Sequence, residues 1–236
     1  MKHLLHLVFI FAFGSVFGQS IGVSTIQTPQ QLVDNVLLGF GVTAFNVNIN
    51  GNPALANTAQ SNVGYFTNTN PAFPINNGLI LTTGNASAAV GPNNSTSFTL
   101  NNPATSSVST DPHLNDIAAG NVTNGVVLEF DFIPAGDTLV FNYMFGSDEY
   151  PEFSPSSFND AFGLFLWGPG ITGPYALAGY PNGGTNIATI PGGIPVTINN
   201  VGDVSNTQYY VFNEAASTLT YGDAIQYDGT TTLLTA

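Results

Sequence analysis

The strongest secondary-structure signal in this chain is Gly125-Val-Val-Leu-Glu-Phe-Asp-Phe-Ile133, followed by Pro134-Ala-Gly-Asp137 and Thr138-Leu-Val-Phe-Asn-Tyr-Met-Phe145. The two outer segments are rich in β-branched and aromatic residues, and the four residues between them are typical of a turn. The pattern predicts two consecutive antiparallel strands. Ala161 to Trp167 follows as a continuous aromatic run, typical of a strand buried on both faces or at a sheet centre.

The remaining signals are short apolar or alternating runs separated by turn residues. We predict further strands at Val42 to Ile49, Gly78 to Thr83, Pro195 to Val201, Gln208 to Asn213 and Thr230 to Thr235. Long loops are predicted at Asn68 to Asn77, Gly91 to Ser109 and Gly168 to Gly184. The chain is therefore predicted to be all-β, with two packed antiparallel sheets in a β-sandwich or jelly-roll-like arrangement.

One short helix is predicted near the N-terminus. Thr28 is a capping residue, Pro29 suits the first helical turn, and apolar residues recur at helical spacing until Gly39. These apolar residues are Leu32, Val33, Val36 and Leu37. A second segment, Asp111 to Ile117, has the composition of one short helical turn.

The first 18 residues have the three parts of a secretory signal peptide. Lys2 supplies the charge, Leu4 to Phe13 is almost unbroken apolar sequence, and Gly18 is a small residue suited to cleavage. A membrane anchor is the alternative, but an apolar core of about ten residues is shorter than the roughly twenty that span a bilayer. We therefore predict a secreted or cell-surface protein in which residues 19–236 form a single domain.

The charge composition is one-sided. Lys2 is the only Lys or Arg, against 14 Asp and Glu residues, and the formal net charge is −13. Nucleic acid is a very poor partner because phosphate is bound through Lys and Arg, and no later segment predicts membrane insertion. The chain also lacks cysteine, so no disulfide can hold it. Clustered acids in residues 19–236 therefore require hydrogen-bond donors, protonation or a bound cation.

Four carboxylates lie within 13 residues, beside the predicted aromatic strands. They are Asp148, Glu149, Glu152 and Asp160, and Asn159 adds an amide oxygen. Calcium takes six to eight oxygen ligands of these kinds. The sequence therefore predicts a Ca²⁺ site formed by these five residues. The alternative is a solvated loop whose carboxylates cap turns, and the spacing is not that of an EF-hand.

Two other roles for acidic residues remain open. Glu149 or Glu152 paired with Asp160 has the composition of a glycosidase acid and base, although the sequence does not give their separation. Glu129 and Asp131 alternate with apolar residues, so they project from one face of their strand. That face is either exposed to solvent or an extension of the cation site.

Other catalytic arrangements lack the residues they need. His113 is the only histidine outside the predicted signal peptide, so residues 19–236 cannot form a two-histidine zinc site. No serine has the surroundings of a nucleophile elbow, and no phosphate loop with its lysine exists. We therefore predict that the protein is not an enzyme.

Several motifs are similar to those of a known family. Phe145-Gly-Ser-Asp-Glu-Tyr-Pro-Glu-Phe153 and Ser157-Phe-Asn-Asp-Ala-Phe-Gly-Leu-Phe165, followed by Gly168-Pro-Gly170, resemble the core signature of the choice-of-anchor L domain family. The family usually reads Phe-Ala-Ser-Glu-Glu-Tyr where this chain has Gly146 and Asp148, a departure that keeps the carboxylate. The likeness extends through Thr28-Pro-Gln-Gln-Leu-Val33, Gly78-Leu-Ile-Leu-Thr-Thr-Gly84, Asn186-Ile-Ala188, Pro195-Val-Thr-Ile-Asn-Asn-Val201 and Gln226-Tyr-Asp-Gly229.

The resemblance implies a secreted or surface protein of the kind found in Bacteroidetes-type bacteria, often exported by type IX secretion. The family domain normally continues past Ala236, so we expect this sequence to be truncated at its C-terminus. We predict a non-catalytic binding or adhesion module, stabilised by Ca²⁺, whose partner is an extracellular glycan or protein surface. The alternatives are a purely structural domain and a carbohydrate-active hydrolase. The sequence does not indicate an oligomeric state.

Overall fold

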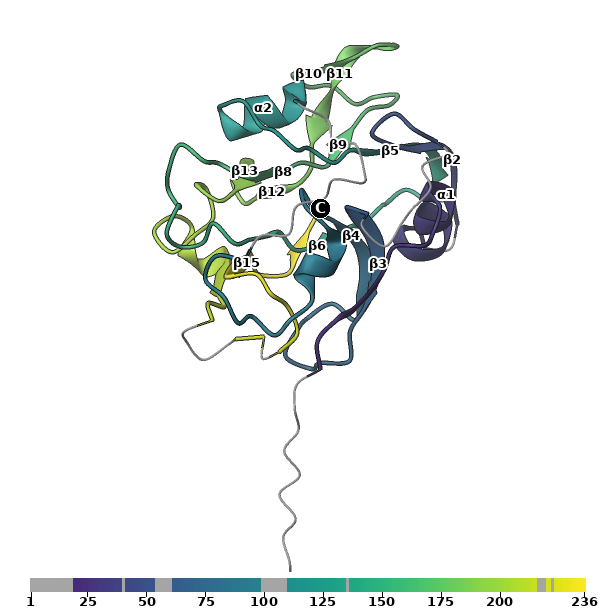
Figure 1. The fold of residues 1–236 in the computed structure, drawn as a ribbon. Helices are drawn as coiled ribbons and strands as arrows, with labels where there is room; N and C mark the ends of the chain where they lie inside the picture. Colours follow the sequence, from purple (N-terminus) through teal and green to yellow (C-terminus); the bar gives the residue numbers. More distant parts are fainter. Residues whose placement is uncertain are drawn as a thin grey trace, which may run out of the picture.

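The computed structural model of the protein describes residues 19–39, 41–53, 61–98, 110–134, 136–215, 220–221 and 223–236. The predicted signal peptide, residues 1–18, lies outside these ranges. Helix α2 (Pro112–Ala118) lies at the same end as the hairpin of β10 (Tyr175–Leu177) and β11 (Tyr180–Asn186), whereas α1 (Pro29–Leu32) lies to one side (Figure 1). None of the helices in these ranges has the length and apolar character needed to cross a bilayer.

The N-terminal helix forms as predicted. Thr28 and Gln31 make a capping box, in which the Thr28 hydroxyl accepts from the Gln31 amide at 3.2 Å and the Gln31 side chain accepts from the Thr28 amide at 3.0 Å. The chain continues as a π-helical turn, Val33–Leu37. Leu32 and Val33 are fully buried, which fixes this helix against the sheets.

Every strand pairing in the described residues is antiparallel. This confirms the predicted all-β antiparallel class with a short helix near the N-terminus. The hydrogen-bonded ladders are short, with two or three strands in each sheet. The sheets combine β1 (Gly22–Ser24), β3 (Val63–Thr67) and β4 (Asn77–Leu81); β2 (Val42–Ile49) and β5 (Leu128–Pro134); β6 (Asn142–Tyr143) and β16 (Leu234–Thr235); β14 (Tyr210–Phe212), β15 (Gly229–Thr231) and β7 (Gly146–Ser147); β12 (Thr189–Ile190), β13 (Ile194–Thr197) and β8 (Ala161–Phe162); and β10, β11 and β9 (Phe165–Leu166).

The aromatic run from Ala161 to Trp167 is divided into two strands, β8 and β9. Between them, the Leu164 amide donates at 3.0 Å to the side chain of Asn186, at the end of β11, instead of to a main-chain carbonyl. All seven residues are partly exposed, so the predicted burial on both faces is wrong. The second strand of the opening motif is also shorter than predicted, because only Asn142–Tyr143 pairs, with β16.

The predicted long loop from Gly168 to Gly184 contains the β10–β11 hairpin. Its glycines permit close backbone approach: a Cβ on Gly184 would lie 2.3 Å from Trp167 Nε1. The segment from Asp111 to Ile117 forms helix α2, and the Asp111 carboxylate accepts from two amides of its first turn. Helix α2 packs against β8 and β13.

A buried cluster supports the strands that lead into the acidic segment. It contains Tyr143, Ile190, Val196 and Val201, with Phe162 packed beside them. The rings of Tyr143 and Phe162 lie 5.1 Å apart. Strands β6, β8, β12 and β13 all contribute to this cluster. The segment between β7 and β8 therefore ends at a strand that packs on the core.

Candidate functional site

The acidic segment connecting β7 to β8, residues 148–160, is tightly bound to residues 198–201. Tyr150 is fully buried, and its hydroxyl donates to the Val201 carbonyl. Ser154 Oγ donates to the Ile198 carbonyl at 2.5 Å. Asn199 and Ser156 exchange two hydrogen bonds at 2.9 and 2.8 Å. The segment is therefore a structured loop, and its side chains project from a fixed backbone.

Asn159 performs a bridging role within this arrangement. Its side-chain nitrogen donates to the Ala118 carbonyl of α2 at 2.8 Å, and its side-chain oxygen accepts from the Asn199 amide at 3.1 Å. The amide thus joins the acidic loop, α2 and the segment after β13. This bonding accounts for Asn159 without a metal ion, so its predicted role as a ligand gains no support.

Asp148 and Asp228 form a carboxylate pair at one end of the β7–β15 pairing. The register pairs Ser147 with Gly229 and Gly146 with Thr230, so Asp148 follows and Asp228 precedes the same end of the paired segment. Asp228 is fully buried; one of its oxygens accepts from Asn93 at 2.7 Å, and Oδ2 has no hydrogen-bond partner. Asp148 Oδ1 is likewise buried without a partner.

Both carboxyl groups of this pair are more basic than an ordinary Asp. Burial, and then the charge of Asp228, raises the pKa of Asp148 to about 7, although a hydrogen bond from the Asp228 main chain opposes the shift. Burial raises the pKa of Asp228 to about 6, against the hydrogen bond from Asn93. Each carboxylate is therefore held in surroundings that disfavour its negative charge.

The other predicted ligands lie around this pair and form a network of their own. Ser147 Oγ donates to Asp160 Oδ2 at 2.9 Å and accepts from the Glu149 amide at 3.1 Å. Burial raises the pKa of Glu149, and the charges of Asp160 and Glu152 add to that shift. These acids therefore repel one another without being neutralised by Lys or Arg.

Acids from distant parts of the chain join the same region. The rings of Tyr150 and Tyr210 lie 4.9 Å apart, and burial raises the pKa of both phenols. Acids that contribute further to those shifts include Asp203 and Glu214. Seven of the chain's 14 carboxylates thus interact in one region: Asp148, Glu149, Glu152, Asp160, Asp203, Glu214 and Asp228.

The predicted five-residue Ca²⁺ site stays a prediction that gains no support from this geometry. Within the described ranges, no three His, Cys, Asp or Glu side chains are placed to hold one metal ion. Asp160 accepts a hydrogen bond from Ser147, whereas the Asp148 carboxylate accepts one from the Asp228 main chain. The structure brings together two buried carboxylates and surrounds them with others.

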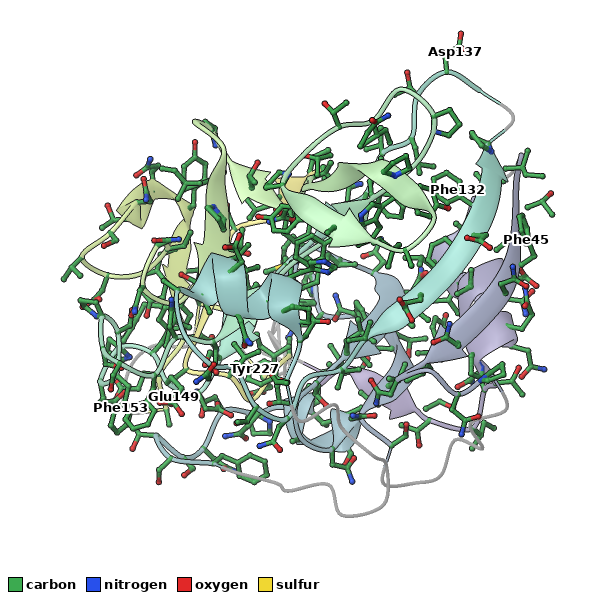
Figure 2. The ribbon with its side chains drawn as sticks, turned by 90° about the horizontal axis from the view of Figure 1, so that it is seen from above. Phe45, Phe132, Asp137, Glu149, Phe153 and Tyr227 are labelled. Carbon is green, nitrogen blue, oxygen red and sulfur yellow. The ribbon has the colours of Figure 1, made fainter. Side chains whose placement is uncertain are left out.

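Two phenylalanines are exposed on the same loop. Phe153 is 48% exposed and Phe158 is 63% exposed. Their rings meet edge to face, with centroids 6.1 Å apart. The Phe153 amide donates to the Glu149 carbonyl at 2.9 Å, and Figure 2 shows Phe153 beside Glu149 at one end of the molecule. We call Glu149, Glu152, Phe153 and Phe158 the acidic aromatic face.

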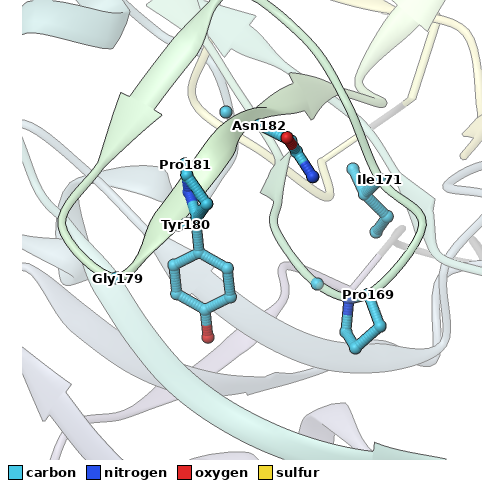
Figure 3. Close-up of a pocket in the computed structure, with 8 residues that line it drawn as sticks. Pro169, Ile171, Gly179, Tyr180, Pro181 and Asn182 are labelled. Carbon is cyan, nitrogen blue, oxygen red and sulfur yellow. The ribbon is translucent and has the colours of Figure 1, made fainter.

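A small pocket lies next to the β10–β11 hairpin (Figure 3). Its volume is about 260 Å³, and its lining includes Tyr180, Asn182, Pro169 and Ile171. The side-chain amide of Asn182 points into the space between Tyr180, Ile171 and Pro169. A second, more open pocket of about 590 Å³ lies beside α1 and includes Tyr65. Neither pocket is lined by a carboxylate, so neither has the two acids of a glycosidase.

The remaining sequence candidates have structural roles. His113 lies on α2, where its Nε2 contacts the Ala176 carbonyl at 3.0 Å and its ring packs 5.1 Å from Phe165. Asp131 on β5 accepts from Asn46 at 2.7 Å. Phe132 of the same strand lies at the opposite end of the molecule from Glu149 (Figure 2), so Glu129 and Asp131 do not extend the acidic region.

Sequence reasoning missed Asp203, Glu214 and Asp228 as members of the acidic region. They lie 40 or more residues after the predicted cluster. The pairing of β14, β15 and β7 brings Glu214 and Asp228 close, whereas Asp203 follows a segment that accepts hydrogen bonds from Tyr150 and Ser154. The sequence does contain a signal for Asp228. This residue stands in Gln226-Tyr-Asp-Gly229, shortly before the predicted strand that starts at Thr230. Asp148 stands in the corresponding place after the predicted strand that ends at Phe145, so antiparallel pairing of the two strands would bring both acids to the same end.

One comparison with known proteins gives a match. The family model described as the choice-of-anchor L domain matches residues 22–236. The match includes Asp148, Asp228 and the two strands, β7 and β15, that they adjoin. No curated protein and no solved structure gives a significant match.

Proposed function

Because this chain belongs to the choice-of-anchor L domain family and is a surface or secreted module, we propose that it is a non-catalytic module that binds a cationic partner protein outside the cell. The observation that carries the proposal is the acidic aromatic face. It combines two exposed phenylalanines with carboxylates that no Lys or Arg of residues 19–236 can neutralise. Its occupant is a protein segment that carries Lys or Arg side chains.

The face has the rigidity that binding surfaces need. Hydrogen bonds between Ser154 or Ser156 and residues 198–199 fix the backbone that carries Phe153 and Phe158. Tyr150 fixes the start of the loop by burying its ring. A surface that is already ordered loses little conformational entropy when a partner binds.

The charges and the rings favour the same kind of ligand. A Lys ammonium or Arg guanidinium over an aromatic ring gains about 0.5–1 kcal/mol at an exposed site. The raised pKa of Glu149, caused by burial and then by Asp160 and Glu152, shows that its negative charge is unfavourably placed. A bound cation reverses that penalty, and the absence of Lys and Arg leaves no internal competitor.

The test uses fluorescently labelled peptides in which Gly alternates with Arg, Glu or Gln. We expect the Arg peptide to bind and the Glu and Gln peptides not to bind. Replacing Phe153 and Phe158 together by Ala should weaken Arg-peptide binding by about five- to thirtyfold, from two cation–π contacts. Phe45→Ala is the matched control, because Phe45 is 42% exposed at the other end of the molecule.

Equal binding by the wild type and the double Ala variant would show that the peptide binds only through the net charge of the protein. The acidic aromatic face would then not be the binding site. Glu149→Gln and Glu152→Gln provide the complementary variants. They should also weaken binding, and the loss should shrink at high salt because exposed charges are screened.

A second candidate ligand is a single sugar residue in the hairpin pocket. The pocket offers the Tyr180 ring for stacking and the Asn182 amide for hydrogen bonding to hydroxyl groups. Saturation-transfer NMR with monosaccharides tests this role. Binding should survive Tyr180→Phe, which keeps the ring, and should be lost in Tyr180→Ala; equal signals from both variants would exclude stacking on Tyr180.

A further inference from the structure

We propose that Asp148 and Asp228 together bind one divalent cation, most suitably Ca²⁺, between β7 and β15. This site differs from the five-residue loop site that the sequence predicts, because its second carboxylate adjoins a strand far along the chain. It also differs from the acidic aromatic face, since its oxygens are buried rather than exposed. The inference goes beyond partner binding and concerns what holds this end of the fold together.

Asp148 directly follows β7 and Asp228 directly precedes β15, so the two residues lie next to each other at the same end of this antiparallel pair, where the last paired residues are Ser147 and Gly229. The Asp228 main chain also donates a hydrogen bond to the Asp148 carboxylate. Two negative charges that share a site repel each other. A divalent cation between them converts this repulsion into attraction.

Each of the two side chains has one buried oxygen that accepts no hydrogen bond. Asp228 is fully buried, and its Oδ2 has no hydrogen-bond partner; Asp148 Oδ1 has none either. Buried polar atoms without partners are rare, and each calls for a bound ion, a water or a proton. A buried carboxylate elsewhere is usually matched by Lys or Arg, which residues 19–236 lack.

The electrostatic field around the pair is negative, because other acids lie near both residues. Glu149 and Asp160 act on Asp148, whereas Glu152 and Glu214 act on Asp228. All four neighbours carry the same sign as the pair, so the surrounding field attracts a cation to this position. Asn93 holds Asp228 in place, with hydrogen bonds to its Oδ1 at 2.7 Å and to the Asn213 carbonyl at 2.8 Å.

The ligand chemistry selects a hard cation. Both donors are carboxylate oxygens, and neither Cys nor His joins them in the described ranges. Calcium accepts carboxylates together with main-chain carbonyls and waters, in flexible geometry. Two protein carboxylates can therefore supply part of its coordination shell, and waters or carbonyls the rest. Mg²⁺ keeps most of its waters and demands stricter geometry, so it should bind more weakly.

The rival occupant of this position is a proton. One proton shared by Asp148 and Asp228 also removes the repulsion and requires no metal. The two occupants differ in their dependence on conditions. A calcium site stabilises the protein more as pH rises, because the ligands must be deprotonated. A proton-bridged pair stabilises it more as pH falls and does not respond to calcium.

The experiment measures the melting temperature of the full chain in EDTA and in CaCl₂ above neutral pH, with calorimetric titration of Ca²⁺ alone. We expect one bound ion and a rise in melting temperature of about 5–10 °C at a hundredfold excess over Kd. Asp228→Asn and Asp148→Asn should each abolish both signals. Asp137→Asn is the matched control; it removes one carboxylate at a position distant from Glu149 (Figure 2) and should leave the response intact.

Two outcomes would overturn the proposal. One is an unchanged melting temperature in calcium for the wild type, which would leave the shared proton as the occupant. The other is an equal calcium response in the wild type and in both Asn variants, which would place the ion elsewhere. If either Asn variant fails to fold, judged by near-ultraviolet circular dichroism, the stoichiometry and melting shift of the wild type still decide between calcium and a proton.

Discussion

In a calcium-free solution, the stability of this protein should fall as pH rises from about 4 to about 7. An Asp carboxyl in an unfolded chain has a pKa of about 3.9. Burial, followed by the charge of Asp228, raises the pKa of Asp148 to about 7 in the folded protein. Between these values the folded protein holds a proton that the unfolded chain has released. The associated stability is therefore fully present below about pH 4 and is lost as pH rises through about 7.

The size of the effect follows from the shift. One pKa unit corresponds to about 1.36 kcal/mol, so a shift of about three units gives a loss of about 4 kcal/mol as the upper limit. Asp228, whose pKa is raised to about 6, contributes in the same direction. Because the two groups interact, their contributions overlap and do not add in full. A loss of this size is a large fraction of a typical domain's roughly 5–15 kcal/mol.

Urea unfolding in EDTA, followed by the fluorescence of the single tryptophan, Trp167, measures this dependence. Asp148→Asn should reduce the slope between about pH 4 and 7, because Asn does not titrate, and the slope that remains should come from Asp228. Asp137→Asn should keep the wild-type slope. A wild-type stability that rises with pH across this window, or an equal slope in the Asp148→Asn variant, would refute the reasoning.

Three further substitutions test contacts that stabilise the fold. Gly229→Ala should cost about 1–3 kcal/mol, because its Cβ would lie 2.6 Å from Tyr210 Cε2, whereas Gly136→Ala has no atom within 4 Å and should be neutral. Asn159→Ala removes two hydrogen bonds and should cost about 1–3 kcal/mol in urea unfolding; a neutral result would show that the loop is not held through this amide. Thr28→Ala should cost about 1 kcal/mol, and Thr28→Ser should restore it; equal losses in both would contradict the capping box.

The sequence predicted those elements in which local chemistry decides the structure. The cap at Thr28 forms because hydroxyl and amide partners lie three residues apart, and Val42–Ile49 forms a strand over its full predicted length. Local patterns did not predict strands in which a glycine is needed for close contact with a neighbouring side chain. Gly184 lies against Trp167 within a strand, although the surrounding Gly, Pro and Asn residues resemble a loop.

The candidate site was predictable only in part for a related reason. The lack of Lys and Arg in residues 19–236 directs attention to Asp148 and its neighbours, because charge balance is a property of composition. The partner of Asp148 is fixed by strand register, which joins residues 80 positions apart and cannot be read from spacing along the chain. For the same reason, Asn159 looked like a ligand but serves as a bridge to α2.

The proposed calcium ion and the proposed cationic peptide are both attracted by the same excess of negative charge. They differ in whether their binding site is buried or exposed. Half of the chain's carboxylates meet in one region, and no Lys or Arg in residues 19–236 can balance them, so positive charge must come from outside the chain or be replaced by protons. Asp148 Oδ1 and Asp228 Oδ2 are buried, so a side chain of another protein cannot contact them without opening the fold. The exposed rings of Phe153 and Phe158 gain nothing from a small hydrated ion, yet suit a side chain that combines charge with apolar carbon. Calcium dependence of stability should therefore follow Asp228, whereas peptide binding should follow the two phenylalanines.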